Sequence, residues 1–411
     1  DSAPKALTEN AAFSVFGFVW APDGKRIAFA ADQPETAADK QRKEWYGEFA
    51  VEDAEWRHRH LWLIDVPADP AAPDSAPKAL TENAAFSVFG FAWSPDGKRI
   101  AFERRPDPLI NSTPGADLAL LDVETKAISS LVSGPGFDGN PLWSPDGQWI
   151  VYSSSGGDTP SNFYQNGVLL KVPTGATGAA PVRRAADLDE QPGQARWTPT
   201  GLYIMAWQKT RRHIFKVDPV SGRTTPFAAQ PDNLFSMDFS KDGKVVALLA
   251  QGPTTLAEVY RSNVDGFKPR AVTTMSEQIA GMELGTSEVV SWTSKDGAVI
   301  EGVLHKPARF DPSRRSPLLV IIHGGPTGID FPQAVYGSVY PVHQWLAKGA
   351  LVLRPNYRGS AGYGEAFRSL NVRNLGVGDA WDVLSGVDHV AWLGIVDTTR
   401  MGAMGWSQGG Y

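Results

Sequence analysis

A short motif recurs along the first 243 residues and limits the folds open to this chain more than any other feature. In each copy an aromatic residue is followed by a turn-forming group: Trp20-APDGK, Trp93-SPDGK, Trp143-SPDGQ, Trp197-TPTG and Phe239-SKDGK. The last four aromatic residues are 50, 54 and 42 positions apart. We expect each aromatic residue to end a strand and the Asp-Gly pair to form a two-residue hairpin, because both positions tolerate positive φ.

The segments between these turns supply further short strands. A β-rich strand follows each turn, and another strand pair comes about twenty to thirty residues later, as in His60-LWLIDV and Ile214-FKVDPVSGRTTPFA. Four short antiparallel strands per unit of about 45 residues are typical of β-propeller blades. A β-sandwich with accidental Asp-Gly hairpins is the alternative, but it would not need the motif to return at this spacing.

We therefore predict an N-terminal β-propeller over residues 1–285. The five turn motifs and one further strand pair, near Val259-Tyr260, are fewer than a closed ring of seven blades needs. We expect the propeller to be incomplete at its start or to carry degenerate blades.

Residues 1–30 recur almost unchanged at 74–103. Only three of the thirty aligned positions differ: Val19/Ala92, Ala21/Ser94 and Ala30/Glu103. Structural repeats that must fit different neighbours usually diverge much further. The copy is either a recent duplication or an assembly error in the sequence, and the residues leave both explanations open.

The pattern changes after Met282, and we predict a second domain over residues 286–411. An antiparallel hairpin is expected over 288–307 and buried strands over 318–322 and 350–356. A helix is expected from Asp379, which we predict to cap it, with Ala380, Val383, Leu384, Val387 and Ala391 on its apolar face. Alternating strands and helices indicate an α/β sheet.

Charge and composition narrow the partners. The net charge of −6 argues against a nucleic acid or an anionic membrane. The absence of cysteine excludes disulfides, thiolate metal ligands and cysteine nucleophiles. No apolar run reaches about 18 residues, so no membrane-spanning helix is expected. We expect a soluble protein of the cytoplasm or periplasm without a cofactor; the compartment and the oligomeric state do not follow from the sequence.

Two neighbouring histidines, His58 and His60 in Glu55-WRHRH, raise the question of a metal site. No carboxylate–histidine spacing here matches a known metal motif. We expect a surface strand or loop and no metal.

The chain ends on MGWSQGGY, in which Gly405, Ser407 and Gly409 form the pattern G-x-S-x-G. This pattern is typical of a strained strand-to-helix turn that presents a nucleophilic serine. A lone match is weak evidence. Here, however, it follows a strand of small residues and comes third in an α/β series, as the turn requires.

A glycine-rich loop, His323-Gly324-Gly325-Pro326, follows the first buried strand. Acyl transfer creates an oxyanion, which needs two hydrogen-bond donors fixed before the reaction. One would be the main-chain N–H of Gln408, directly after the serine. The other would come from this loop, where missing side chains let the backbone approach. We predict Gly325 as that donor, with Gly324 the next choice; the alternative is a plain turn at the end of a strand.

Four motifs in this order resemble those of the prolyl oligopeptidase family of serine peptidases. They are HGGP at 323–326, NYRGSAGYG at 356–364, GVGD at 376–379 with Asp382, and GWSQGGY at 405–411. The HGGP form is similar to that of acylaminoacyl peptidases and dipeptidyl aminopeptidases. The resemblance covers nearly the whole chain.

The resemblance implies a propeller in front of an α/β-hydrolase domain. The propeller would act as a lid that admits short peptides and excludes folded proteins. It also implies that Ser407 is the nucleophile and that the amides of Gly325 and Gln408 form the oxyanion hole. The loop that begins at Arg358 would support the site rather than react.

The general base that Ser407 needs is not in its usual place. In α/β-hydrolases the order along the chain is Ser, then Asp or Glu, then His. All seven histidines precede the serine: His58, His60, His213, His305, His323, His343 and His389. We therefore expect a C-terminally truncated, partial hydrolase domain that lacks about a hundred residues, including the triad acid and base. Such a fragment would be inert, and its open sheet edge would make it poorly soluble.

An acidic segment, Glu44-WYGEFAVEDAEWRHRH, lies between two predicted strands of the first blade. Exopeptidases of this kind often bind a free substrate amine with carboxylates from the propeller. Glu48 and Glu52 are therefore candidate amine anchors; a solvated charged loop is the alternative.

Three classes of function stay open. The favoured class is a serine peptidase that hydrolyses short peptides through an acyl-enzyme. The others are an esterase on the same hydrolase fold and a non-catalytic propeller that binds partners. The intact G-x-S-x-G favours an enzyme, because a site without function does not need a strained turn. Residue preference and endo- or exopeptidase action are not determined by the sequence.

Overall fold

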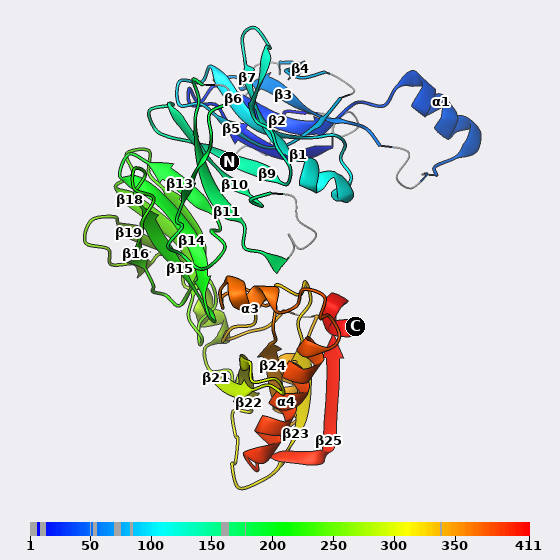
Figure 1. The fold of residues 1–411 in the computed structure, drawn as a ribbon, viewed down its shortest axis with the longest axis vertical. Helices are drawn as coiled ribbons and strands as arrows, with labels where there is room; N and C mark the ends of the chain where they lie inside the picture. The colour runs from blue at the N-terminus through cyan, green and yellow to red at the C-terminus, as the bar shows by residue number, and fades with distance from the viewer. Residues whose placement is uncertain are drawn as a thin grey trace. The chain divides into compact units, whose positions relative to one another are not determined.

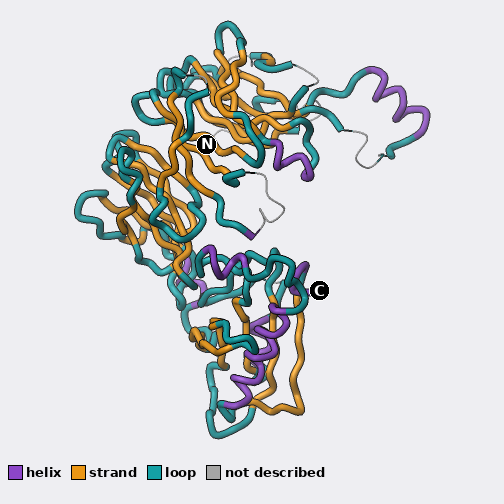
Figure 2. Tube along the Cα trace, viewed as in Figure 1, coloured by secondary structure: helices purple, strands orange, loops and turns teal. Residues whose placement is uncertain are grey.

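The computed structural model describes residues 6–8, 14–49, 51, 56–69, 75–82, 85–157, 164–176, 178–337 and 339–411. The chain divides into two compact units. One comprises Asp1–Thr159 with Gly167–Arg184, and the other Pro160–Asn166 with Ala185–Tyr411. Strands dominate the first unit, whereas the C-terminal part of the second also contains helices (Figures 1 and 2).

The first unit contains three four-stranded antiparallel sheets, in each of which the strands are neighbours in chain order. The second strand of each sheet is mostly buried, because its apolar run is covered on both sides. A helix, α1 (Ala37–Tyr46), is inserted between β2 and β3 and begins with a capping box of Thr36 and Asp39. The strands are β1 (Val15–Trp20), β2 (Arg26–Asp32), β3 (Arg59–Asp65), β4 (Lys78–Ala79), β5 (Ser87–Trp93), β6 (Arg99–Arg105), β7 (Asp117–Asp122), β8 (Ile128–Val132), β9 (Asp138–Trp143), β10 (Trp149–Ser154), β11 (Val168–Pro173) and β12 (Val182–Arg184).

The turn between the first two strands is not the predicted two-residue hairpin. Ala21 to Gly24 form a β-turn in which the Gly24 N–H donates to the Ala21 carbonyl (2.9 Å), and Gly24 has a φ of 68°. The turn differs because it begins two residues before the Asp-Gly pair, so that only the glycine needs a positive φ. Pro22, whose ring fixes φ near −65°, suits its second position. Asp23 then accepts the N–H of Lys25 (2.8 Å). The same turn recurs at Gly97, Gly147 and Gly243.

Indole rings join neighbouring sheets of the first unit. Trp93, at the end of β5, donates its Nε1–H to the Val19 carbonyl on β1 (3.3 Å). Trp143, at the end of β9, donates to the Ala92 carbonyl on β5 (3.0 Å). In these sheets the aromatic residue of the motif therefore binds one sheet to the next. This is a physical reason for the recurrence of the aromatic residue in each copy of the motif.

The second unit begins with an eight-stranded sheet made of two four-stranded antiparallel halves. One parallel pair, Arg212 with Asn233, joins the halves. The three sheets of the first unit and the two halves of this sheet make five four-stranded groups among the described residues. The motif also occurs five times. Their closure into a propeller ring stays a prediction. The strands are β13 (Ala195–Thr198), β14 (Gly201–Gln208), β15 (Arg211–Val217), β16 (Thr224–Ala228), β17 (Asn233–Phe239), β18 (Val245–Gln251), β19 (Glu258–Asn263) and β20 (Arg270–Ala271).

The C-terminal part holds a five-stranded mixed sheet in the order β21-β22-β24-β23-β25. β21 (Thr286–Thr293) and β22 (Val299–Lys306) form the expected antiparallel hairpin. β24 (Leu351–Asn356) is antiparallel to β22 and parallel to β23 (Ser316–Ile322), and β25 (Val396–Gly405) is parallel to β23. All residues of β24 are buried, as expected of a central strand covered on both faces.

The helices of this part are α2 (Val342–Ala347), between β23 and β24, and α3 (Glu365–Ser369) and α4 (Gly378–Trp392), between β24 and β25. α4 packs on β21, where the Trp292 indole donates to the Asp382 carbonyl (2.8 Å). The predicted cap of this helix is wrong: Val377 is the N-cap, and Asp379 lies inside the first turn. The N-cap lies two residues earlier than expected, and a carboxylate within the first turn still meets the positive end of the helix dipole.

One residue predicted for the apolar face of α4 is not covered: Leu384 is exposed. Val383 is buried, and Val387 and Ala391 pack against the core that includes Trp292.

The architecture changes between β20 and β21, and the predicted domain boundary at 285/286 lies in that connection. The compact units divide instead at 184/185 and around 160–166, so the boundary stays a prediction. Among the described residues, no helix has the length and hydropathy needed to cross a membrane.

Candidate active site

The serine of the G-x-S-x-G motif lies at a sharp turn. β25 ends at Gly405 and a short 3-10 helix covers Ser407–Gly410. Ser407 is exposed and has a φ of 56°, in the left-handed region that a side chain with a Cβ seldom adopts. Such a conformation costs about 1–3 kcal/mol and is found where the surrounding structure enforces it.

The two glycines of the motif are required by close packing. A Cβ atom at Gly405 would collide with the carbonyl group of Gly409. A Cβ atom at Gly409 would in turn collide with the carbonyl group of Ile322, at the end of β23. The turn can therefore fold back on the sheet only because both positions lack a side chain.

The predicted glycine loop lies against this turn. A Cβ atom at Gly324 would be 2.6 Å from the Trp406 carbonyl oxygen and 3.0 Å from the Ser407 Cβ. Gly325 follows with a φ of 59°, in a turn that the Gly328 N–H closes on the Gly325 carbonyl (2.7 Å). The structure thus brings the HGGP loop and the serine together, with Gly324 in direct contact and Gly325 next to it.

Gln408, the other predicted oxyanion donor, is fixed through its side chain. Its Nε2 donates to the Asp379 Oδ2 (3.1 Å), at the start of α4. A cavity of about 320 Å³ lies beside it, and Tyr357 and Asp379 are among the residues that line it together with Gln408. The carboxylate that was predicted to cap the helix therefore holds the residue after the serine.

His323 belongs to the support of the site. Its ring is buried and stacks on Tyr357, with ring centroids 4.4 Å apart. Its Nε2 lies 3.1 Å from the Ser360 Oγ, and burial lowers the pKa of the imidazole. In the described part of the chain, no hydrogen bond joins the Ser407 Oγ to a histidine ring. The absence of a catalytic base from the chain stays a prediction.

Arg358 is a buried residue at the centre of an ion-pair network with the buried Asp382 and the exposed Asp296. Its guanidinium binds both carboxylate oxygens of Asp382 (2.7 and 2.9 Å) and both of Asp296 (2.8 and 2.9 Å). These bonds raise the pKa of Arg358 and lower the pKa of Asp296 to about 2. Asn371 donates to the Arg358 carbonyl (2.7 Å). The network ties the loop after β24 to α4 and to the β21–β22 turn.

Sequence reasoning missed Asp296. It lies in an ordinary Ser-Lys-Asp-Gly turn, and its partner is 62 residues away. Since an ion pair between distant segments leaves no local pattern, no signal in the sequence could have identified it.

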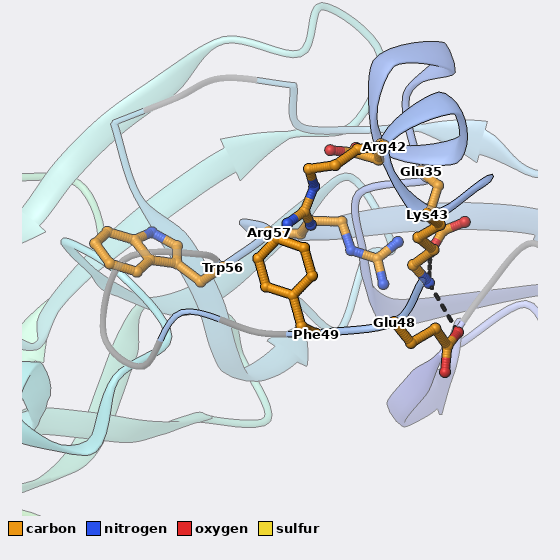
Figure 3. Close-up of a pocket in the computed structure, with 8 residues that line it drawn as sticks. Glu35, Arg42, Lys43, Glu48, Phe49, Trp56 and Arg57 are labelled. Carbon is orange, nitrogen blue, oxygen red and sulfur yellow. Dashed lines mark hydrogen bonds and ion pairs between the residues drawn. The ribbon is translucent and has the colours of Figure 1, made fainter. Parts of the chain in front are cut away.

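Glu48, a predicted amine anchor, lies after α1 in the first unit, and Glu52 lies outside the described residues. The Glu48 side chain is 85% exposed and forms an ion pair with Lys43 (3.4 Å). Figure 3 shows this pair at a cavity of about 640 Å³ that Phe49 and Trp56 also line. Glu48 therefore has access to a cavity, but a lysine already neutralises part of its charge.

The two histidines near this segment lie differently from the prediction. His60, on β3, is completely buried, so the expectation of a surface position is wrong for it. Its strand lies between β2 and β4 in the first sheet, and the Thr81 Oγ1 lies 3.3 Å from the His60 Nδ1. The His58 Nδ1 lies 3.1 Å from the Ser87 Oγ. Over the described residues, no group of three or more His, Asp or Glu side chains is arranged to bind a metal.

Comparison with known proteins supports the resemblance found in the motifs. Residues 338–411 match the model of the prolyl oligopeptidase family. This segment contains α2, β24, α3, α4 and β25 as well as the turn at Ser407.

Two curated proteins match almost the whole chain. Dipeptidyl-peptidase 5 of Porphyromonas gingivalis is 22% identical over 424 residues, which covers 97% of this chain and 60% of that protein. The uncharacterized peptidase YuxL of Bacillus subtilis is 23% identical over 482 residues, which covers 95% of this chain and 69% of that protein. The chain thus spans well under three quarters of the length of either relative.

A solved structure shows the shared fold. The acylaminoacyl peptidase of Pyrococcus horikoshii superposes with a TM-score of 0.75 at 19% identity, over 97% of this chain and 60% of that protein. These matches confirm the resemblance given by the motifs: residues 338–411 are similar to the prolyl oligopeptidase family of peptidases.

Proposed function

We propose that this chain is part of a serine peptidase that hydrolyses short peptides through an acyl-enzyme on Ser407. The observation that carries the proposal is the conformation of this serine, with a φ of 56° at the end of β25 and with Gly324 packed against it. Residues in such conformations cluster at active sites, where the surrounding structure enforces them. The match of residues 338–411 to a peptidase family supports the same conclusion.

In the proposed reaction the Ser407 Oγ attacks the carbonyl carbon of the scissile peptide bond. A C–O bond forms, and the carbonyl π electrons move onto the oxygen, where the N–H groups of Gly325 and Gln408 donate to the developing charge. The hydroxyl proton passes to a general base and from there to the leaving amine as the C–N bond breaks. Water then cleaves the ester by the same steps and regenerates the hydroxyl.

The fixed surroundings of the two donors support these roles. The Gln408 side chain is bonded to Asp379, and the turn that contains Gly325 is closed by Gly328. Donors held in place before the reaction lower the barrier because little reorganisation is needed as the charge develops.

We also propose that the 411-residue chain is itself inert. His323 faces Ser360, and none of the described histidines is bonded to Ser407, so no histidine among the described residues is in place to accept the hydroxyl proton. We expect hydrolysis of peptidyl p-nitroanilides by this chain to be no faster than by its Ser407→Ala variant. Serine-dependent turnover clearly above that variant would disprove inertness while supporting the peptidase.

The peptidase itself is tested with the longest product of the gene, compared with its Ser407→Ala variant. We expect a fluorophosphonate probe to label the wild type and not the variant. Absence of labelling would indicate the alternative of a non-catalytic scaffold. Matched peptide and ester substrates then separate a peptidase from an esterase, since hydrolysis of esters alone would favour the esterase.

For substrate binding, we propose Glu48 as an anchor for a free substrate amine. Its exposed carboxylate lies at a cavity that Phe49 and Trp56 also line, and an ammonium group there would have to displace Lys43 from the carboxylate. The cavity is lined by three acidic side chains, Glu35, Asp39 and Glu48, and by three basic ones, Arg42, Lys43 and Arg57. Glu48→Gln in the longest gene product should raise the KM for free but not for blocked N-termini. An unchanged preference for free N-termini would remove this assignment.

A further inference from the structure

The loop between β24 and α3, Gly359–Gly364, is held from outside the mixed sheet. Both main-chain groups of Gly362 are bonded to connections between antiparallel strands: its N–H donates to the Glu190 Oε2 (2.5 Å), between β12 and β13, and its carbonyl accepts the Lys209 N–H (2.7 Å), between β14 and β15. Gly362 has a φ of 91°, and a Cβ atom here would clash with the Lys209 carbonyl. The loop is thus shaped to receive these partners.

Glu190 is the centre of this contact. It lies between β12 and β13, and its side chain is only 2% exposed. Its second oxygen, Oε1, lies 3.4 Å from a guanidinium nitrogen of Arg368, which is also buried. The preceding residue, Asp189, accepts the Glu365 N–H at the start of α3 (3.0 Å). A buried carboxylate with these partners holds the loop and α3 together.

The held loop is bonded directly to the predicted oxyanion loop. Next to Gly362, the Ala361 N–H donates to the Gly328 carbonyl (3.3 Å). The Gly328 N–H in turn closes the turn at Gly325 (2.7 Å). One residue further, the Ser360 Oγ lies 3.1 Å from the His323 Nε2. Two hydrogen bonds and short stretches of backbone therefore separate Glu190 from Gly325.

We propose that Glu190 is a positioning residue that fixes the oxyanion loop through Gly362. This inference rests on the proposed function for its kinetic consequence, but not for its structural one. Without the Glu190 carboxylate, the Gly362 N–H and the Arg368 guanidinium would both be buried without this partner. The loop that contains Gly362 would then be held less firmly, and so would residues 323–328, which are bonded to it.

Amide hydrogen exchange of residues 323–328 in the 411-residue chain tests the positioning. We expect exchange to become about 10-fold faster in Glu190→Ala and about 3-fold faster in Glu190→Gln, whose amide oxygen still accepts from Gly362. Asp187→Ala is the matched control. Asp187 lies in the same loop but accepts the Thr224 N–H within the antiparallel sheet, so residues 323–328 should exchange as in the wild type.

Unchanged exchange at 323–328 in either Glu190 variant would overturn the proposal. An equal increase at β24 (351–356) would also overturn it, because it would show a general loss of stability. Glu190→Gln decides the matter if Glu190→Ala does not fold.

Kinetics of the longest gene product supply the second readout. We expect Glu190→Ala to lower kcat about 10-fold and to leave KM within about 2-fold, because an oxyanion donor acts mainly in the transition state. A raised KM with an unchanged kcat would contradict the role. If the wild type shows no serine-dependent hydrolysis, the proposed function fails, whereas the exchange result still decides whether Glu190 positions the loop.

Discussion

β1 and β5 contain the two copies of one sequence, VFGFVW at 15–20 and VFGFAW at 88–93, yet their surroundings differ. Val15 is 45% exposed and Val88 is fully buried; Trp20 is 48% exposed and Trp93 is 7% exposed. β5 packs between the preceding sheet, through β3, and the following sheet, through β9. Because the sequences are almost identical, the difference in burial comes from the neighbouring sheets rather than from the strand itself.

The two copies of one phenylalanine show the same contrast. The Arg59 guanidinium lies between them, 3.4 Å from the ring centroid of Phe16 and 4.7 Å from that of Phe89. Phe89 also has the guanidinium of Arg105 3.8 Å from its centroid. The second copy is thus enclosed by cations from two strands, whereas Phe16 is 52% exposed. Within the described residues, the second copy packs against strands of two other sheets, which accounts for its deeper burial.

The largest difference in stability is expected between separate substitutions of the two equivalent tryptophans, Trp20 and Trp93. Trp93→Ala should lower the free energy of unfolding by about 3–5 kcal/mol, because it leaves a cavity and removes the bond to Val19. Trp20→Ala should cost less than about 1 kcal/mol, since half of its surface is already in water. Urea unfolding of both variants, followed by circular dichroism, measures the difference. Equal losses would show that the sequence of the strand, and not its neighbours, sets its contribution.

A second test replaces Ala30 with the residue found at the equivalent position of the second copy, Glu103. Glu103 is 2% exposed and forms an ion pair with Arg105 (2.7 Å), whereas the equivalent Ala30 is followed two residues later by Asp32. Ala30→Glu should therefore bury a carboxylate beside another carboxylate and cost about 3 kcal/mol. Thermal unfolding measures it, with Ala30→Gln as the control for size. A loss no greater than that of Ala30→Gln would contradict the electrostatic cause.

A smaller effect on stability is expected from the turn between β5 and β6. The Ser94 Oγ donates to Asp96 (2.6 Å) and accepts the Arg99 N–H (2.9 Å), and the equivalent residue in the first copy, Ala21, can form neither bond. Ser94→Ala should lower the free energy of unfolding by about 1 kcal/mol. Ala21→Ser should raise it by up to the same amount. A loss of stability in Ala21→Ser would show that the first turn cannot adopt the geometry of the second.

The smallest effect concerns pH. The hydroxyl of Ser94 is the main cause that lowers the pKa of Asp96. A carboxyl with a lowered pKa stabilises the fold above its unfolded pKa of about 3.9, and this stabilisation is lost as the pH falls through the folded pKa. The loss in the free energy of unfolding caused by Ser94→Ala should therefore be greatest at pH 6 and smaller at about pH 2.5. Urea unfolding at both values checks this, and a constant cost would exclude the ionised Asp96 as the partner.

The sequence was a good guide where a local pattern has one physical cause. The recurring Trp/Phe and Asp-Gly signals predicted the strand pairs, because an aromatic strand end and a turn glycine are needed in every unit. It failed in the placement of turns and helix caps. At four copies of the motif the Asp-Gly pair ends a turn that begins two residues earlier, and the N-cap of α4 is Val377 rather than Asp379.

The meeting of the two site motifs was predictable, but their support was not. HGGP and G-x-S-x-G follow β23 and β25, which are adjacent parallel strands, so their carboxyl ends lie at the same edge of the sheet. Asp296 and Glu190 contact the site region from 62 and 172 residues away in the chain. Only the fold brings such partners together, since neither lies in a recognisable motif.

The indole bonds between sheets have a practical consequence for spectroscopy. Trp93 and Trp143 each point an N–H at a carbonyl oxygen of the adjoining sheet, and Trp20 forms no such bond within the described residues. In a two-dimensional ¹⁵N NMR spectrum, every sheet junction of the first unit therefore has its own resonance. The chain carries native labels that report the opening of each junction separately, with Trp20 as the reference for an indole in water.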